Sequence, residues 1–360
     1  MRATLRNLCT STALALTPAS GLAMGLGADG EWSDLDREVN ALASSLLLKG
    51  GGPGLFGRVQ TAYRGSSDLP GGPGGLGGFG VADARLGLTG AYGSYEYRLE
   101  VDFADDLGSG TLGLLDAHAS FTLTDTVTAT LGRFRPEIST NGLLDSGDMV
   151  FLGRSVIGTA LAARDEGLML QGALSDLDWT LCIMNGLDGQ DDDALASLRI
   201  NLDLKPSPQS PIRGRSEGAY GGPEEFGVRA SVAFVEDRDP LGSYCALAEL
   251  LAGSDRWSLA FETAHVGSRD FASLTSNISD ILAADTNPYS LGLTLMVQED
   301  WELALRVQDY DLGDLRQFDL GLNHYVAGHD LKWILGLTHL ESDTAAKDVD
   351  LWGFALNVGF

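Results

Sequence analysis

Asp116, His118 and Ser120 stand at alternate positions of one stretch and supply a carboxylate, an imidazole and a hydroxyl. Those are the groups of a hydrolytic site, provided that hydroxyl and imidazole lie within hydrogen-bonding distance beside donors for an oxyanion. A polar strand face produces such a trio without any catalytic role, because alternate side chains share one side. We therefore expect no enzyme and keep an esterase or phospholipase as an alternative. The five histidines lie far apart, so no metal site and no cofactor are expected.

Charged residues recur at alternate positions along the chain, and such residues suit the wall of a water-filled channel. The alternative for each of them is an ion pair across neighbouring strands that only stabilises the wall. The residues predicted to line the pore or set its selectivity are Arg58, Arg85, Glu96, Arg98, Glu100, Asp102, Asp116, Arg133, Arg135, Asp148, Arg154, Arg164, Arg199, Arg306 and Lys332.

The stretch 95–103 shows which element positions these charges. Its odd-numbered residues are large and apolar, whereas the four even-numbered ones between them are charged. A period of two indicates a strand, and neither a soluble core nor a soluble surface suits both faces. A wet interior and a lipid exterior explain both faces at once. The last stretch, 351–360, repeats the pattern, with Trp352, Phe354 and Phe360 on the apolar side.

The whole of residues 54–360 reads as about sixteen such strands of roughly nine to eleven residues, long enough to cross a bilayer at a tilt. Short and long connectors alternate, as in outer-membrane barrels, except that 204–224 is long where a short turn is due. The fold class is therefore an all-β transmembrane antiparallel barrel with a short N-terminal helix. The predicted strands begin near residues 55, 79, 94, 113, 127, 166, 178, 195, 226, 243, 256, 288, 301, 316, 331 and 349.

Composition limits the function. The 360 residues carry a formal net charge of −26, which argues against a nucleic-acid partner. Residues 1–23 have the basic start, apolar middle and small terminal residues of a signal peptide. Residues 24–53 hold a helical pattern at 31–48 and a glycine-rich joint. This helix is either a small coiled coil or a helix lying on the barrel mouth.

Several short stretches give the chain a family resemblance. They are 82–90, 97–103, 115–117, Leu131-Gly132-Arg133-Phe134-Arg135-Pro136, 184–186, 305–311 and 321–323. In this order, over residues 55–360, the chain resembles the phosphate-selective porins O and P. The resemblance implies a sixteen-stranded barrel in the outer membrane of a Gram-negative-type bacterium. It also implies a homotrimer that passes small hydrophilic solutes or ions across the lipid bilayer. In the family, the loop after the strand that carries this Gly-Arg-Phe-Arg-Pro run folds inward, which here is 136–165.

The composition of 136–165 agrees, because it is rich in leucine, valine, isoleucine, methionine and phenylalanine. So much apolar surface must be buried, and the inside of the barrel is the expected place. The alternatives are packing over the rim or at a subunit contact. A plugged, non-conducting barrel is a third function class, but 24–50 is too short for a plug domain.

Charge decides the expected selectivity. The inward loop carries Glu137, Asp145, Asp148, Asp165 and Glu166 against Arg154 and Arg164. We therefore expect a weakly selective diffusion pore that favours cations. The alternative is an anion- or phosphate-selective porin, in which Arg154 and Arg164 join Arg133 and Arg135 in a basic ladder while the acids point elsewhere.

Overall fold

The computed structural model describes residues 53–67, 77–104, 112–186, 194–205, 217–237, 243–267, 286–311, 315–341 and 348–360. The expected signal peptide at 1–23 and the helix at 31–48 lie outside these residues. Among the described residues, no helix is long and apolar enough to cross a bilayer.

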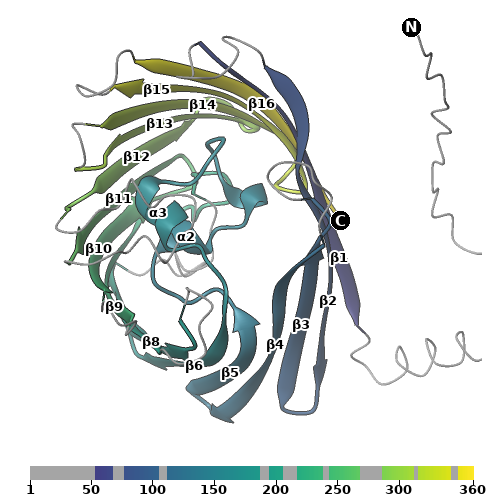
Figure 1. Ribbon diagram of the computed structural model, residues 1–360, viewed down its shortest axis with the longest axis vertical. Coiled ribbons are helices and arrows are strands. Elements are labelled where there is room, and N and C mark those ends of the chain that lie inside the picture. The colour runs from purple at the N-terminus through teal and green to yellow at the C-terminus, as the bar shows by residue number, and fades with distance from the viewer. Residues whose placement is uncertain are drawn as a thin grey trace, which may run out of the picture. The chain divides into compact units, whose positions relative to one another are not determined.

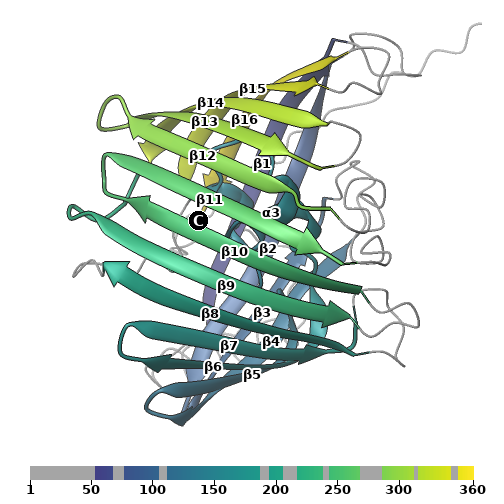
Figure 2. The ribbon, with the colours of Figure 1, turned by 90° about the vertical axis from the view of Figure 1, so that its left-hand side faces the viewer.

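Sixteen antiparallel strands form a closed barrel in which each strand pairs with its neighbours in the sequence and β1 pairs with β16 (Figures 1 and 2). Each strand begins within one residue of its predicted start, so the predicted fold class is confirmed. The strands are β1 (Gly54–Ser66), β2 (Gly78–Tyr92), β3 (Tyr95–Asp102), β4 (Gly113–Thr124), β5 (Val127–Phe134), β6 (Asp165–Leu174), β7 (Leu177–Met184), β8 (Leu195–Lys205), β9 (Gly227–Asp237), β10 (Ser243–Gly253), β11 (Trp257–Val266), β12 (Tyr289–Met296), β13 (Trp301–Asp309), β14 (Arg316–Ala327), β15 (Leu331–Glu341) and β16 (Val349–Gly359).

The two faces of the wall follow the alternation of the sequence. On β16, Phe354 is 41% exposed on the outer side, while its neighbour Ala355 is 4% exposed on the inner side. Short turns join the strands at one rim, shown on the left in Figure 2. Gly93 and Gly328 adopt φ of 64° and 61° in two of these turns, a conformation that costs glycine little.

The connector from β5 to β6, residues 135–164, is called the inner loop here. It contains α2 (Thr140–Leu143), the 3₁₀ turn η1 (Ser146–Asp148) and α3 (Val156–Ala160). Figure 1 shows α2 and α3 inside the ring of strands. The predicted inward fold is therefore correct, and the physical reason is an apolar core inside the barrel.

That core joins the apolar residues of the inner loop to the inward side chains of one half of the wall. Val156, Ile157 and Leu161 are each at most 4% exposed. They belong to one cluster with inward residues of β6 to β11, among them Cys182 and Cys245, which are both free thiols. This half of the lumen is packed rather than wet.

Three glycines on the inner face of β14 to β16, Gly321, Gly336 and Gly353, make room for the inner loop. The Cδ1 atom of Leu152 lies 2.6 Å and 2.7 Å from the positions that a Cβ would take on Gly336 and Gly353. Val150 O lies 2.6 Å from that position on Gly321. At these three positions the absence of a side chain allows the loop to approach the wall this closely.

The substitution Gly336→Val should therefore displace Leu152 and the inner loop with it. We expect a loss of about 1–3 kcal/mol in the free energy of unfolding and an altered single-channel conductance. Gly292→Val is the matched control, because the nearest atom to its Cβ position lies 3.8 Å away. Equal conductance in the Gly336→Val variant and the wild type would contradict this account.

The seam between β1 and β16 closes on the last residue. Phe360 N donates to Gly57 O at 3.1 Å, and Gly57 N donates to Phe360 O at 3.0 Å. The Phe360 side chain is 66% exposed on the outer face. Unpaired backbone groups are costly in hydrocarbon, so this terminal pair supports closure.

Deletion of Phe360 should lower the amount of folded protein in the outer membrane, because both closing hydrogen bonds are lost. Phe360→Tyr keeps the backbone pair and an aromatic ring and serves as the control. Folded and unfolded chains can be separated by comparing unheated and boiled samples on a gel. Equal folded yields for the deletion and the control would count against the role of the seam.

Candidate pore constriction

Local sequence shapes the two short helices of the inner loop. Ser139 Oγ caps α2 by accepting from Gly142 N at 3.1 Å, and Ser155 Oγ caps α3 by accepting from Gly158 N at 2.8 Å. Asn141 Oδ1 accepts from Ser155 N at 2.9 Å. A hydrogen bond within the loop therefore links the first turn of α2 to the start of α3.

Three basic residues predicted to line the pore point into the barrel but lie beneath the inner loop. Arg199 Nη2 is 2.5 Å from Glu249 Oε2, and Arg199 Nη1 donates to Ile138 O. Arg306 Nη2 donates to Gly153 O at 3.0 Å, and Lys332 Nζ donates to Met149 O at 2.7 Å. Each of the three is at most 4% exposed. All three therefore contact the inner loop and are almost fully buried.

The other wall, β1 to β5, faces the opposite edge of the inner loop across charged side chains. At one end Arg58 Nη1 donates to Ser146 Oγ at 3.3 Å, and at the other Arg164 Nε is 2.8 Å from Asp116 Oδ1. Between these two contacts lies the candidate constriction, called the eyelet here. The eyelet consists of Arg85, Arg98 and Asp116 on the wall and Arg135, Asp145, Arg154 and Arg164 on the inner loop.

The wall arginines of the eyelet are neutralised by carboxylates. Arg98 pairs with Glu100 at 2.6 Å and with Asp116 at 3.4 Å. Arg85 pairs with Asp102 at 3.2 Å, and also with Asp83. The wall therefore agrees with the alternative interpretation of its charges, because ion pairs within and between strands leave it little net charge.

Arg135 and Arg154 differ from the wall arginines. Both guanidinium groups donate to one carbonyl oxygen, that of Leu144, with Arg135 Nη1 at 3.1 Å. Among the described residues, neither has a carboxylate oxygen within ion-pair distance, and the buried Nε of each has no hydrogen-bond partner. Burial and the charges of Arg164 and Arg154 lower the pKa of Arg135 to about 9, so it stays protonated at neutral pH.

Asp145 is the carboxylate of the inner loop that faces these arginines. Its Oδ1 lies 3.5 Å from Arg85 Nη1. Burial raises the pKa of Asp145, but Arg58 and Arg135 outweigh burial, so the pKa lies below its usual value. Asp145 is therefore ionised at neutral pH.

The remaining acids that were expected to make the inner loop negative lie away from the eyelet. Glu137 accepts from Thr180 Oγ1 at 2.9 Å, and Asp165 accepts from Gly186 N at 2.9 Å. Asp148 Oδ1 lies 3.7 Å from His329 Nδ1, beside a short turn. Glu96, which was predicted to line the pore from the wall, is exposed near the turn between β2 and β3.

Arg133 also lies away from the eyelet. It pairs with Glu166 at 2.8 Å across β5 and β6, on the face opposite the buried Phe134 and Asp165. Strand β5 ends at Phe134, and Pro136 cannot extend the ladder, so Arg135 turns inward. Two arginines of one motif thus reach opposite sides of the wall.

Sequence reasoning missed Glu217, on the long connector between β8 and β9 that had no explanation. Glu217 lies inside the barrel and contacts the inner loop through Asn141 Nδ2 at 2.8 Å and Val150 N at 3.2 Å. Tyr220 follows it and stacks on Tyr325, with ring centroids 3.9 Å apart. An acid in a stretch rich in glycine, proline and serine gives no signal of such a contact.

Among the described residues, no hydrogen bond links His118 to Ser120, and Nδ1 of His118 has no partner. Ser120 Oγ shares a hydrogen bond with Thr130 Oγ1 at 2.8 Å, and Asp116 is engaged by Arg164. The described residues also contain no cluster of three or more side chains suited to a metal ion.

The chain resembles known proteins in the part that holds the inner loop. Residues 57–202, which build β1 to β8 and the whole inner loop, match the phosphate-selective porin O and P family. Over these residues the chain is similar to that porin family. It is an outer-membrane porin, and its barrel forms a water-filled channel for small hydrophilic solutes, narrowed by the inner loop. No curated protein sequence matches the porin.

Solved structures share the fold of the porin at low identity. An anion-selective porin from Comamonas acidovorans has a TM-score of 0.60 and 16% identity, covering 86% of this chain and 100% of its own. A loop-deletion mutant of OmpT from Vibrio cholerae has 0.59 and 11%, covering 86% and 99%. The high-pH structure of OprB from Pseudomonas putida has 0.56 and 10%, covering 90% and 97%.

The substitution Asp116→Asn should free Arg98 and Arg164 of their shared carboxylate. We expect the permeability ratio of chloride to potassium to rise, because charges at the constriction act at short range. Asp203→Asn is the control, since it breaks an ion pair with Arg229, 2.6 Å long, on β8 and β9. A rise of the same size in both variants would show that the eyelet is not where ions are selected.

Proposed function

We propose that the porin conducts small anions in preference to cations, by passive diffusion and without catalysis, in the outer membrane of a Gram-negative-type bacterium. The observation that carries this proposal is the convergence of Arg135 and Arg154 on Leu144 O without a paired carboxylate among the described residues. Two like charges held together favour an anion beside them.

This proposal replaces the expectation of cation preference. That expectation counted five acids on the inner loop, but only Asp145 faces the arginines of the eyelet. The net charge of −26 does not reverse the argument. Exposed charges beyond a Debye length of about 8 Å are screened at ~0.15 M salt, whereas charges at the constriction act on every ion that passes.

Phosphate, as a divalent or monovalent anion, fits the same arginines and is the ligand named for the family. Planar guanidinium groups bind phosphate oxygens through paired hydrogen bonds. Arg135 and Arg154 bring two such guanidinium groups together at the eyelet. We therefore propose inorganic phosphate as one of the anions that the eyelet accepts.

A homotrimer is the proposed assembly, and it rests on the family resemblance alone. Unheated detergent samples should migrate on a gel as a species about three times the mass of the boiled chain. Migration of the unheated protein as a folded monomer would refute this assembly.

The selectivity is tested by reversal potentials of single channels in a potassium chloride gradient. The wild type should favour chloride, and Arg135→Gln with Arg154→Gln should abolish that preference. We expect each guanidinium to contribute on the order of 1 kcal/mol, or about a fivefold change in the permeability ratio. Arg133→Gln is the matched control, because it removes the same charge two residues away on the outer face.

Cation preference in the wild type would overturn the proposal, as would an equal effect of Arg133→Gln. Phosphate is tested separately, by adding it to channels that carry chloride. Reduced chloride current in the wild type, but not in the double variant, supports phosphate binding at the eyelet. Equal reduction in both would place any phosphate binding elsewhere.

A further inference from the structure

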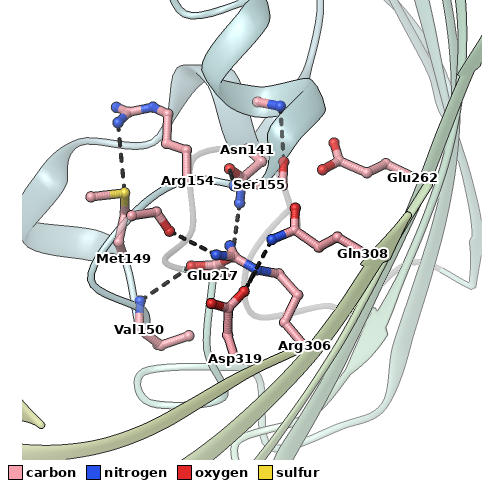
Figure 3. Close-up of polar contacts among 12 residues, drawn as sticks. Asn141, Met149, Val150, Arg154, Ser155, Glu217, Glu262, Arg306, Gln308 and Asp319 are labelled. Carbon is pink, nitrogen blue, oxygen red and sulfur yellow. Dashed lines mark hydrogen bonds and ion pairs between the residues drawn. The ribbon is translucent and has the colours of Figure 1, made fainter. Parts of the chain in front are cut away.

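Glu217 reaches the inner loop from the opposite rim of the barrel. The inner loop leaves β5 at the rim of long loops, whereas the β8–β9 connector leaves the rim of short turns. Glu217 N donates to Asp148 O at 3.2 Å, so the two loops also share a backbone hydrogen bond. Figure 3 shows the Glu217 carboxylate between Asn141, Val150 and Arg306.

The carboxylate of Glu217 joins three parts of the channel. One oxygen accepts from Asn141 Nδ2 at 2.8 Å and from Arg306 Nη1 at 3.2 Å, and the other accepts from Val150 N at 3.2 Å. Asn141 belongs to α2, Val150 to the later half of the inner loop and Arg306 to the wall strand β13. The Glu217 side chain is 6% exposed, so water does not compete freely for these bonds.

A short path leads from this carboxylate to the eyelet. Asn141, which donates to Glu217, accepts from Ser155 N at 2.9 Å. Ser155 is the residue after Arg154, and Leu144, whose carbonyl receives both unpaired arginines, directly follows α2. A shift of Asn141 therefore moves the backbone on both sides of the eyelet.

The charge of Glu217 suits this place. Arg306 faces Asp319 at 2.9 Å and Glu217 at 3.2 Å, and its guanidinium lies 4.3 Å above the Phe151 ring. Phe151 and Gly153, whose carbonyl Arg306 also binds, lie in the inner loop just before Arg154. Arg306 is thus the wall residue of a network of contacts that extends through the inner loop to the eyelet.

We propose that Glu217 is a positioning residue for the constriction: the β8–β9 connector acts as a latch that fixes the inner loop, and through it Arg154, from the other side of the membrane. The latch determines how steadily the eyelet stays open. The part of this inference that concerns Arg154 rests on the proposed anion preference, whereas the part that concerns the loop does not.

The test compares Glu217→Ala and Glu217→Gln with Glu225→Gln in single-channel recordings. Glu225 is exposed on the same connector, so its variant removes an equal charge without touching the latch. We expect open-channel current noise to rise severalfold in Glu217→Ala, with frequent partial closures. Glu217→Gln should be intermediate, because its amide oxygen still accepts from Asn141 or Val150.

A merely structural role would lower the yield of folded porin and leave the current of each folded channel unchanged. Only channels reconstituted from protein that passes the heat-shift gel test are therefore recorded. Wild-type noise and conductance in folded Glu217→Ala channels would overturn the latch. If the alanine variant does not fold, Glu217→Gln decides alone: noise equal to that of Glu225→Gln overturns the proposal.

The reversal potential separates this inference from the proposed function. Higher noise in Glu217→Ala with cation preference in the wild type would support the latch and refute the anion eyelet. Anion preference in the wild type with quiet Glu217→Ala channels would support the eyelet and refute the latch.

Discussion

The porin depends on the burial of an apolar loop inside its own barrel. Ile157 and Leu161 of the inner loop pack on inward residues of β6 to β11, and this removes apolar surface from the lumen water. Toward β1 to β5 the loop instead presents charged and polar groups, such as Ser146 to Arg58 and Arg164 to Asp116. The candidate constriction lies on this charged side, with Arg98 and Asp116 on the wall. Position and chemistry of the constriction thus follow from an ordinary hydrophobic contact.

The fold could be read from the sequence because lipid allows few exceptions. Outward residues such as Phe354 must be apolar and every backbone group must be paired, so period two marks each strand almost to the residue. The inner face is under no such rule. Cys182 on β7 and Val235 on β9 are apolar although they face inward. Only the path of the inner loop shows that they form a core.

The site was harder to predict, because its residues lie on the inner face, where lipid imposes no pattern. Alternation gives the side on which Arg199, Arg306 and Lys332 lie, but not that the inner loop covers them. Alternation also treats Arg133 and Arg135 alike, whereas the end of β5 before Pro136 sends them to opposite faces. The contacts of Glu217 join residues 67 or more positions apart, and no local pattern records such a pairing.

The inner loop also touches both sides of the barrel seam. Ser146 meets Arg58 on β1, and Leu152 lies on Gly353 of β16. Strands β1 and β16 are almost the full length of the barrel sequence apart, and bringing such distant segments together costs entropy. The inner loop contacts both strands, so it bridges the seam from inside the barrel. The segment that narrows the lumen therefore also ties together the two strands whose pairing closes the cylinder.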